Sequence, residues 1–251
     1  MSSKTGKTKI LATIGPATDK REKLEALIDA GLDGIRLNFS HGNKEYFENV
    51  FNLINDICIQ KALPIPILVD LQGPKIRIGE LSEPEIFIQS GDIIEITSED
   101  IPGTKDKIST SYKELVNDSL VYETILIDDG LIRLQIVDKK TKSVVCRVIE
   151  GGVLKPKKGM NLPGMNLSTP SVTDKDLDNL EFALKHRVDF IALSFVRKAD
   201  DIIQLRKWLT KRGYNKPIIA KIEKQEAITN FEEILHEADG IMVARGDLGV
   251  E

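Results

Sequence analysis

Hydrophobic positions in the first seventy residues alternate between two periods. Short apolar runs rich in β-branched residues lie at 9–15, 34–40 and 64–73, and such runs bounded by Gly or Pro are typical of buried strands. Between them, in 19–31 and 46–62, apolar residues recur every three or four positions, which is the spacing of one helix face. Strands that alternate with helices of this length predict right-handed βαβ units around a parallel sheet.

The pattern changes between Pro74 and Thr169, where the helical period disappears. Three segments in this region alternate like short strands, with Gly, Asp and Lys at their turns: 86–97, 123–138 and 143–152. They predict a compact antiparallel β insertion that forms a small barrel. From Ser171 the strand–helix alternation returns, with expected helices at 173–187, 199–213 and 226–238, and expected strands at 189–195, 217–223 and 240–246.

These patterns define one α/β fold class. A closed (β/α)₈ barrel needs eight strands in about 250 residues, and here about 95 of the 251 residues form the insertion. We therefore expect an incomplete TIM-type barrel with six of the eight strands, interrupted after strand three by a small all-β barrel domain. The expected domains are barrel segments 1–74 and 170–251 and the inserted β barrel 75–169. An open sheet of this kind has exposed edges, so we expect either a fragment of a longer enzyme or pairing with another chain.

Composition and charge exclude several classes of protein. The formal net charge of −4 argues against nucleic-acid binding, which needs a clustered basic surface. No apolar run approaches the roughly 18 residues of a membrane helix, and the N-terminus lacks the apolar core of a signal peptide. Cys58 and Cys146 match no metal spacing, so we interpret them as reduced, packed thiols in a cytoplasmic protein.

Polar side chains occur where the expected strands end. In parallel barrels the reactive groups lie at the carboxyl ends of the strands, and five strands here supply polar groups at that end: Arg36, Asn38, Ser40, Asp70, Ser194, Arg197, Lys221, Glu223, Arg245 and Asp247. Lys221 and Glu223 have the same parity in one strand, so they share a face, either as a buried ion pair or as a site. Glu223 and Asp247 are oxygen donors of the kind that Mg²⁺ binds, and we favour the site.

Two other patterns invite a functional interpretation. Arg245-Gly246-Asp247 spells an adhesion tripeptide, but adhesion requires export and an exposed loop tip, whereas this tripeptide follows a strand of buried type. His41 beside Ser40 suggests a nucleophile and base, yet no third orienting group is evident, and a structural histidine is favoured. His186 and His236 are interpreted as surface helix positions.

Seven ordered stretches together resemble the pyruvate kinase family. They span the chain with the family's separations: TIGPAT (13–18), IRLNFSHG (35–42), DLQGPKIR (70–77), KKGMNLPG (157–164), SFVRKA (194–199), AKIEKQEA (220–227) and IMVARGDLGVE (241–251). The resemblance implies a (β/α)₈ A domain interrupted by a β-barrel B domain, in agreement with the strand pattern. It also implies transfer of a phosphoryl group from phosphoenolpyruvate to ADP, giving pyruvate and ATP.

The resemblance assigns roles residue by residue. Glu223 and Asp247 match the ligands of Mg²⁺ or Mn²⁺, and Lys221 matches the lysine that stabilises charge on the phosphoryl group and enolate. Arg36 matches a phosphate-binding arginine, so Arg36 and Lys221 are the expected catalytic residues. The backbone N–H groups of Gly246 and Asp247, at the start of a helix-like turn, match the cradle of the substrate carboxylate.

The inserted domain carries the expected nucleotide contacts. Arg77 and Lys158 match cations of the family that contact ADP or ATP. Because Lys158 lies inside the insertion, we expect the inserted domain to close over the nucleotide as a lid.

One departure concerns the monovalent cation. Many family members bind K⁺ through residues that match Asn38, Ser40, Asp70 and the position of Leu71, where threonine is usual. Those members also carry a glutamate where this chain has Lys75. Here Leu71, Gln72, Lys75 and Ile78 together resemble the members that work without K⁺, since a lysine ammonium can supply the positive charge. We expect no requirement for K⁺.

The resemblance leaves open whether this chain is itself catalytically active. Family members have two more barrel strands and a C-terminal domain that carries allosteric effectors and subunit contacts, and the parent enzyme is expected to be a homotetramer. We therefore expect the 251-residue chain alone to bind phosphoenolpyruvate and Mg²⁺ without turnover. A different Mg²⁺-dependent barrel enzyme that acts on phosphoenolpyruvate is a third possibility, and ADP binding distinguishes it.

Overall fold

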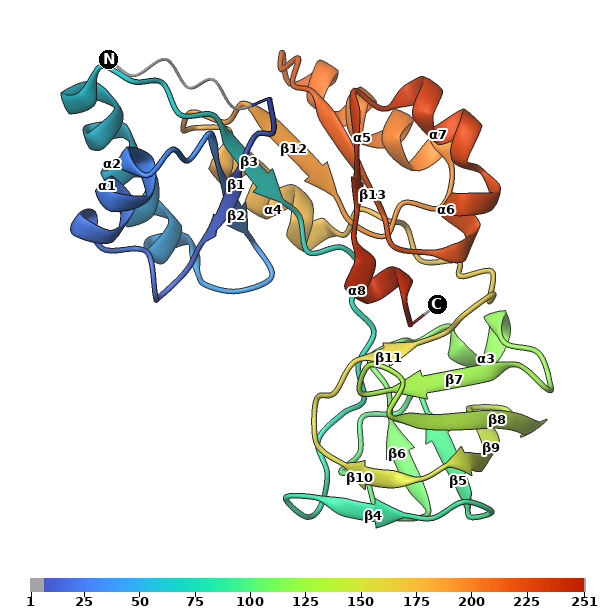
Figure 1. Cartoon of the computed structure of the whole chain (residues 1–251). Helices are drawn as coiled ribbons and strands as arrows, with labels where there is room; N and C mark the ends of the chain where they lie inside the picture. Colours follow the sequence, from blue (N-terminus) through green and yellow to red (C-terminus); the bar gives the residue numbers. More distant parts are fainter. Residues whose placement is uncertain (1–6, 251) are drawn as a thin grey trace. The chain divides into compact units, whose positions relative to one another are not determined.

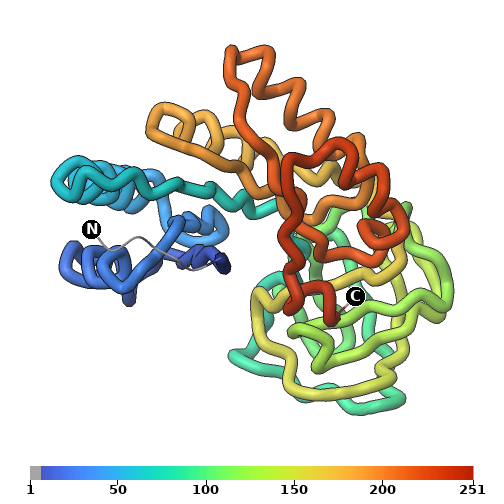
Figure 2. Tube along the Cα trace, turned by 45° about the horizontal axis from the view of Figure 1, so that its top comes forward, coloured from blue at the N-terminus to red at the C-terminus, as the bar shows by residue number. Residues whose placement is uncertain are grey.

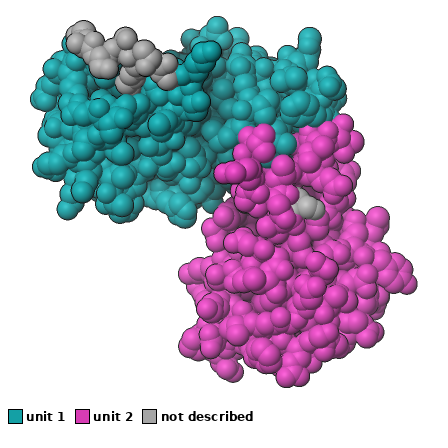
Figure 3. Space-filling model, in the orientation of Figure 1, with its two compact units in different colours: residues 1–73, 171–222, 230–242 teal, residues 74–170, 223–229, 243–251 magenta. Residues whose placement is uncertain are grey.

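The structure is a computed structural model, and it describes residues 7–250. It divides into two compact units, which are described separately (Figure 3). The first unit comprises the described residues up to Gly73 together with 171–222 and 230–242. The second comprises 74–170, 223–229 and the described residues from Val243. The expected domain boundaries at 74/75 and 169/170 stay predictions, and their outer ends at 1–6 and 251 lie outside the described residues.

The first unit is built on one parallel half-barrel of six strands (Figure 1). Its strands neighbour one another in chain order: β1 (Leu11–Ile14), β2 (Gly34–Asn38), β3 (Ile67–Asp70), β12 (Phe190–Leu193), β13 (Ile218–Ile222) and β14 (Gly240–Val243). β12 pairs directly with β3, with Ala192 opposite Asp70, although the whole insertion separates them along the chain. The expected six-strand partial barrel, interrupted after its third strand, is therefore confirmed.

Helices lie along the outer side of this curved sheet (Figure 2). They are α1 (Arg21–Asp29), α2 (Lys44–Lys61), α4 (Asp174–Ala183), α5 (Ala199–Lys211) and α7 (Phe231–Glu237). Leu24 of α1, Ile54 of α2 and Leu205 of α5 are each at most 1% exposed, and full burial of such a side chain contributes about 1.5–3 kcal/mol. α2 begins where the side chain of Asn43 accepts a hydrogen bond from the Tyr46 N–H at 2.8 Å, as an N-cap does.

The helix expected at 226–238 forms as two shorter helices. α6 (Gln225–Thr229) ends before Asn230, and α7 starts after it. Asn230 has φ −99° and ψ 22°, outside the helical range, and its Nδ2 donates to the carbonyl of Arg197 at 2.8 Å. The apolar period runs through Asn230 unbroken, so only the contact with a distant loop reveals the interruption.

The last strand differs from the expectation in its burial. We expected 240–246 to be a strand of buried type, but β14 ends at Val243 and its residues are half-buried or exposed, with Val243 59% exposed. β14 lies at the edge of the sheet, next to β13 only, and an edge strand lacks neighbours on one side. The chain continues into α8 (Arg245–Leu248), so the adhesion tripeptide is helical.

The second unit contains the all-β insertion. Its main sheet has the order β11-β7-β8-β9-β5-β6, and a separate pair joins β10 to β4. The strands are β4 (Ile86–Ile88), β5 (Ile93–Thr97), β6 (Lys107–Ser109), β7 (Thr124–Ile127), β8 (Ile132–Lys139), β9 (Ser143–Glu150), β10 (Gly152–Leu154) and β11 (Met160–Asn161). Isoleucines from several of these strands fill one apolar core, among them Ile94, Ile125 and Ile136, each fully buried.

The insertion differs from the expectation in two details. β5 pairs with β6 in parallel, with Glu95 opposite Lys107, whereas an antiparallel insertion was expected. β6, β10, β11 and the short helix α3 (Leu115–Asp118) were not predicted. Each has two to four residues, too short for an apolar period to identify.

Both cysteines are free and buried, as expected for packed thiols. Among the described residues, none of the helices has the length and apolar character needed to cross a membrane.

Candidate functional site

A charged cluster occupies the carboxyl ends of β2, β3 and β13 in the first unit. Arg36 projects from β2, and its Nε and Nη2 lie 2.7 and 2.5 Å from Oδ2 of Asp70 at the end of β3. Its Nη1 donates to Oγ1 of Thr13 at 2.8 Å, and Thr13 is its register partner on β1. The parallel register therefore places Thr13 opposite Arg36, whereas Asp70 lies opposite Asn38, two residues further along β2.

Lys221 joins the same cluster from β13. Its Nζ lies 3.2 Å from Oδ1 of Asp70 and donates to Oγ of Ser194 at 2.7 Å. The side chains of Lys221 and Asp70 are only 11% and 1% exposed. A buried ammonium is costly unless it is paired and hydrogen-bonded, and these two acceptors provide that pairing.

Two cations share one carboxylate in this cluster. Each oxygen of Asp70 faces a different cation: Oδ2 accepts a hydrogen bond from Arg36, and Oδ1 lies beside the Lys221 ammonium. The three side chains together therefore carry one excess positive charge. Such a group attracts an anion with several oxygens, and arginine is the side chain best suited to bind a phosphate through two hydrogen bonds.

The structure gives Lys221 an acidic neighbour that the pattern of its own strand does not indicate. Sequence parity offered an ion pair with Glu223 as one alternative, and the structure brings Lys221 beside Asp70 on another strand. Ile219, two residues before Lys221, lines an apolar pocket of the sheet. Since alternate residues share a face, Lys221 extends from the same face of β13.

The residues that match monovalent-cation ligands lie near this cluster. Asn38 ends β2, and its Oδ1 accepts a hydrogen bond from the Ser40 N–H at 3.0 Å. Leu71 is 1% exposed, and its side chain has no oxygen to offer a cation. Lys75 is exposed and belongs to the second unit.

The two predicted Mg²⁺ ligands belong to the second unit. Glu223 directly follows β13 and is 1% exposed, whereas Asp247 lies exposed in α8 together with Gly246. The expected helix-like turn at Gly246 and Asp247 is thus present. Across residues 7–250, no group of three or more His, Cys, Asp or Glu side chains is arranged to hold a metal.

The two predicted nucleotide contacts are neighbours in the second unit. Nη1 of Arg77 donates to the carbonyl of Lys157 at 2.8 Å, and Arg77 forms a β-bridge with Gly159. Lys158 lies between Lys157 and Gly159 in the sequence, and its Nζ is paired with Oδ1 of Asp128 at 2.8 Å. The structure therefore brings two cations that are far apart in sequence onto adjacent segments.

Three residues of these clusters received no role from the sequence. The sequence pattern indicates Ser194 only as a polar strand end and indicates no role for Thr13 or Asp128. Thr13 begins the first of the seven stretches and could have been found from its register with Arg36. Asp128 lies in a tight turn, and no local pattern points to Lys158.

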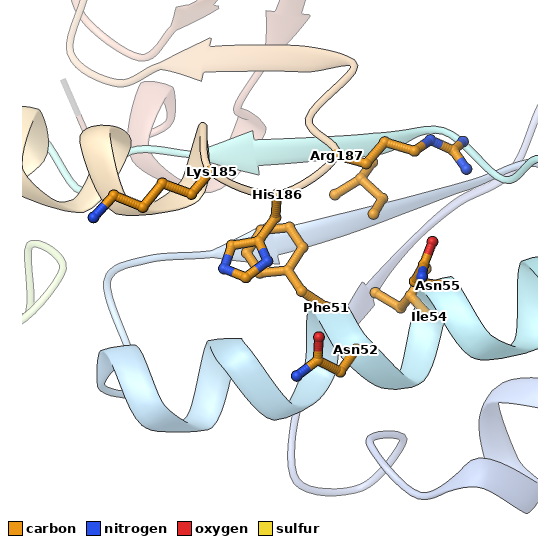
Figure 4. Close-up of a pocket in the computed structure, with 8 residues that line it drawn as sticks. Phe51, Asn52, Ile54, Asn55, Lys185, His186 and Arg187 are labelled. Carbon is orange, nitrogen blue, oxygen red and sulfur yellow. The ribbon is translucent and has the colours of Figure 1, made fainter.

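Two of the three histidines are exposed, and the third packs against aromatic side chains. His186 follows α4, stacks on Phe51 with ring centroids 4.6 Å apart, and its Nε2 lies 3.1 Å from Glu48. It lines a pocket of about 210 Å³ beside α2 (Figure 4). Its side chain is only 17% exposed, so the expected surface position is wrong for His186, because the aromatic stack covers it. His236 and His41 are exposed, and the expected surface position of His236 is confirmed.

Comparisons with known proteins agree with one another. The sequence model of the family "Pyruvate kinase, barrel domain" matches residues 5–251. Pyruvate kinases from Staphylococcus aureus strains MRSA252 and USA300 are each 43% identical over 247 residues, covering 98% of this chain and 42% of the relative. The crystal structure of a pyruvate kinase from Cryptosporidium parvum is similar with a TM-score of 0.91 and 38% identity, covering 97% of this chain and 52% of that one. The chain thus spans less than half the length of these curated relatives.

Proposed function

Because the chain belongs to the pyruvate kinase family, we propose that it carries the phosphoenolpyruvate and divalent-metal site of an enzyme that transfers a phosphoryl group to ADP. The observation that supports this most directly is the cluster of Arg36, Asp70 and Lys221, which places two cations around one buried carboxylate. Phosphoryl transfer is mainly a matter of positioning the reactants and stabilising charge. A rigid cluster with an excess positive charge provides both.

In this proposal Arg36 and Lys221 have separate tasks. Arg36 binds the phosphate of phosphoenolpyruvate through guanidinium N–H groups, while Thr13 and Asp70 fix the plane of the guanidinium. Lys221 stabilises the negative charge that develops on the phosphoryl group and on the enolate oxygen as the bond to phosphorus breaks. Because the cluster is preorganised and largely buried, its charges act at low cost of reorganisation.

Glu223 and Asp247 are the proposed ligands of Mg²⁺ or Mn²⁺. Mg²⁺ is commonly bound by one or two carboxylates and completes its shell with water and substrate oxygens. A donor set of two carboxylates therefore fits this ion without a third protein ligand. When bound, the metal neutralises charge on the phosphoryl group, and the backbone of Gly246 and Asp247 in the first turn of α8 binds the substrate carboxylate.

Arg77 and Lys158 are the proposed contacts to the phosphates of ADP. Their support is the adjacency of the two segments, since the Ile78 N–H also donates to the Lys158 carbonyl at 3.0 Å. Recognition of ADP by these cations distinguishes the proposal from a different Mg²⁺-dependent barrel enzyme acting on phosphoenolpyruvate.

We further propose that K⁺ is not required. Asp70, which matches a K⁺ ligand, is already bonded to Arg36 and Lys221, and Leu71 contributes an apolar side chain at a position where an oxygen is usual. The ammonium of Lys75 supplies the missing positive charge. A cytoplasmic location and a homotetrameric parent enzyme remain predictions.

A second candidate function follows from the length of the relatives. The chain covers 42% of the Staphylococcus aureus pyruvate kinases. In this second candidate, turnover needs residues that lie outside this span. We propose on this ground that the 251-residue chain binds Mg²⁺ and phosphoenolpyruvate but does not turn over by itself.

The test is calorimetric titration of the chain with phosphoenolpyruvate in the presence and absence of Mg²⁺. Binding that needs Mg²⁺ is expected, and Lys221→Gln should abolish it while Lys207→Gln, an exposed lysine on α5, leaves it unchanged. Absence of Mg²⁺-dependent binding by the folded chain contradicts the proposal. Pyruvate formation from phosphoenolpyruvate and MgADP at ordinary rates contradicts only the second candidate.

A further inference from the structure

Ser194 follows β12 and lies at the centre of the charged cluster, with only 2% of its surface exposed. Its Oγ donates to the carbonyl of Leu71 at 2.7 Å, while Oδ1 of Asp70 is farther away at 3.3 Å. A hydroxyl has one proton and two lone pairs. Because the shorter bond to Leu71 uses the proton, the lone pairs are left to accept from Lys221, whose Nζ lies at 2.7 Å.

Acceptors at the ends of two strands, β3 and β12, therefore direct the Lys221 ammonium. One is Oδ1 of Asp70 at 3.2 Å, but that carboxylate is also held by Arg36 through its other oxygen. The hydroxyl of Ser194 is nearer to the ammonium, and the carbonyl of Leu71, directly after β3, orients that hydroxyl. A lysine has a flexible four-carbon stem, so the loss of the nearer acceptor leaves the ammonium more freedom.

We propose that Ser194 is a positioning residue, which holds the Lys221 ammonium in the orientation that substrate binding and phosphoryl transfer require. Its consequence for substrate rests on the proposed function, whereas its effect on the ammonium does not. Ser194 itself touches no reacting atom in this proposal. It acts through Lys221.

The space around Ser194 allows a sharp choice of variants. A Cβ built on Gly73 would lie 3.1 Å from the Cβ of Ser194, so Gly73 packs closely against this side chain, and the variants at 194 are kept small. Ser194→Ala removes the acceptor and leaves a small void. Ser194→Cys keeps a side chain of similar shape, but a thiol is only a weak hydrogen-bond acceptor. An effect of lost volume is therefore seen in the first variant alone, and an effect of the lost acceptor in both.

Ser171 offers a matched control in the same unit. It is 1% exposed, and its Oγ donates to the carbonyl of Phe195 at 3.0 Å. Ser171→Ala therefore removes a buried hydroxyl and its bond to a main-chain carbonyl, as Ser194→Ala does, while it keeps the bond between Ser194 and Lys221.

The experiment measures proton exchange of lysine ammonium groups in the 251-residue chain by nitrogen-15 NMR. The Lys221 signal is assigned by its loss in Lys221→Gln. We expect exchange roughly ten-fold faster in Ser194→Ala and Ser194→Cys, because a hydrogen bond to a charged group is lost, and no change in Ser171→Ala. Wild-type exchange in Ser194→Cys, or equal acceleration in Ser171→Ala, overturns the proposal. If Ser194→Ala does not fold, the cysteine variant decides alone.

A second readout is the affinity for phosphoenolpyruvate with Mg²⁺, measured by calorimetry. Both Ser194 variants are expected to bind roughly ten-fold more weakly, with Ser171→Ala unchanged. Wild-type affinity in the Ser194 variants overturns the link to substrate. If the wild-type chain binds no phosphoenolpyruvate, the proposed function fails, and the exchange rates still decide whether Ser194 positions Lys221.

Discussion

Asp176 is the residue whose replacement tests the architecture of the first unit most directly. It is 1% exposed and lies in the first turn of α4, where its Oδ2 accepts from the N–H and the hydroxyl of Thr173 at 3.0 and 2.5 Å. Its Oδ1 accepts from the N–H groups of Gln72 and Gly73 at 2.9 and 3.2 Å. One carboxylate thus joins the segment that leaves the half-barrel after β3 to the helix that follows the insertion.

The size of the effect follows from these four bonds. Each hydrogen bond to a charged group contributes about 1.5–3 kcal/mol, and a buried N–H left without a partner costs about 1–3 kcal/mol. Because the bonds share one carboxylate, their values do not add in full. Asp176→Ala should therefore destabilise the first unit by roughly 3–5 kcal/mol, a large share of the ~5–15 kcal/mol that typically stabilises a folded protein.

Asp176→Asn should cost about half as much, roughly 2 kcal/mol. The amide keeps one oxygen for Gln72 and Gly73, but its NH₂ group then faces the N–H of Thr173. Asp178 on the same helix is the control, since its carboxylate is 67% exposed and is paired with an exposed Lys44. Exposed pairs contribute about 0.2–1 kcal/mol, so Asp178→Asn should change stability by less than about 1 kcal/mol.

Urea unfolding followed by tryptophan fluorescence measures this change. The chain has a single tryptophan, Trp208 on α5, which lies in the first unit and reports on that unit. The unfolding midpoint should fall in the order wild type and Asp178→Asn, then Asp176→Asn, then Asp176→Ala. An Asp176→Ala variant within about 1 kcal/mol of wild type would show that these bonds contribute little to the fold.

Three further outcomes are expected. Burial raises the pKa of the Cys146 thiol to about 12, so a disulfide reagent near neutral pH should label it only when the second unit unfolds; labelling at the rate of a free thiol in the folded chain refutes this. Hydrogen bonds from Lys140 first and Ser143 next lower the pKa of Glu95 from 4.5 to about 2, so Glu95 stabilises the fold above pH 4.5 and loses that effect as pH falls towards 2. Glu95→Gln should thus destabilise the second unit by about 1 kcal/mol at neutral pH, as measured by unfolding followed by circular dichroism. The difference in unfolding free energy between variant and wild type should shrink as the pH falls towards 2, and a difference that is the same at every pH contradicts a stabilising role for the Glu95 carboxylate. The affinity for phosphoenolpyruvate with Mg²⁺ should be equal in K⁺ and in tetramethylammonium, and Lys75→Glu should make this affinity depend on K⁺. A wild-type chain that binds phosphoenolpyruvate only with K⁺ would show that Lys75 does not take the place of K⁺.

The sequence by itself determined the order and type of most elements. Apolar periodicity located all six strands of the half-barrel and the insertion after the third, because each strand and helix of ordinary length buries one face and so repeats its own period. The polar residues at strand ends could also be found, since parallel strands bring their carboxyl ends to one edge. Arg36, Asp70 and Lys221 can all be found in this way.

Only the tertiary structure decided how those residues pair. Strand parity puts Lys221 and Glu223 on one face, either as an ion pair or as a site, but only the fold shows that the Lys221 ammonium lies beside Asp70 on another strand. The break of the last expected helix at Asn230 and the anchoring of Asp176 to Gln72 likewise depend on partners far along the chain. Periodicity records which face a residue presents, whereas hydrogen-bond partners are set by which strands and loops become neighbours in space. That physical difference is why the elements could be predicted and the network at their ends could not.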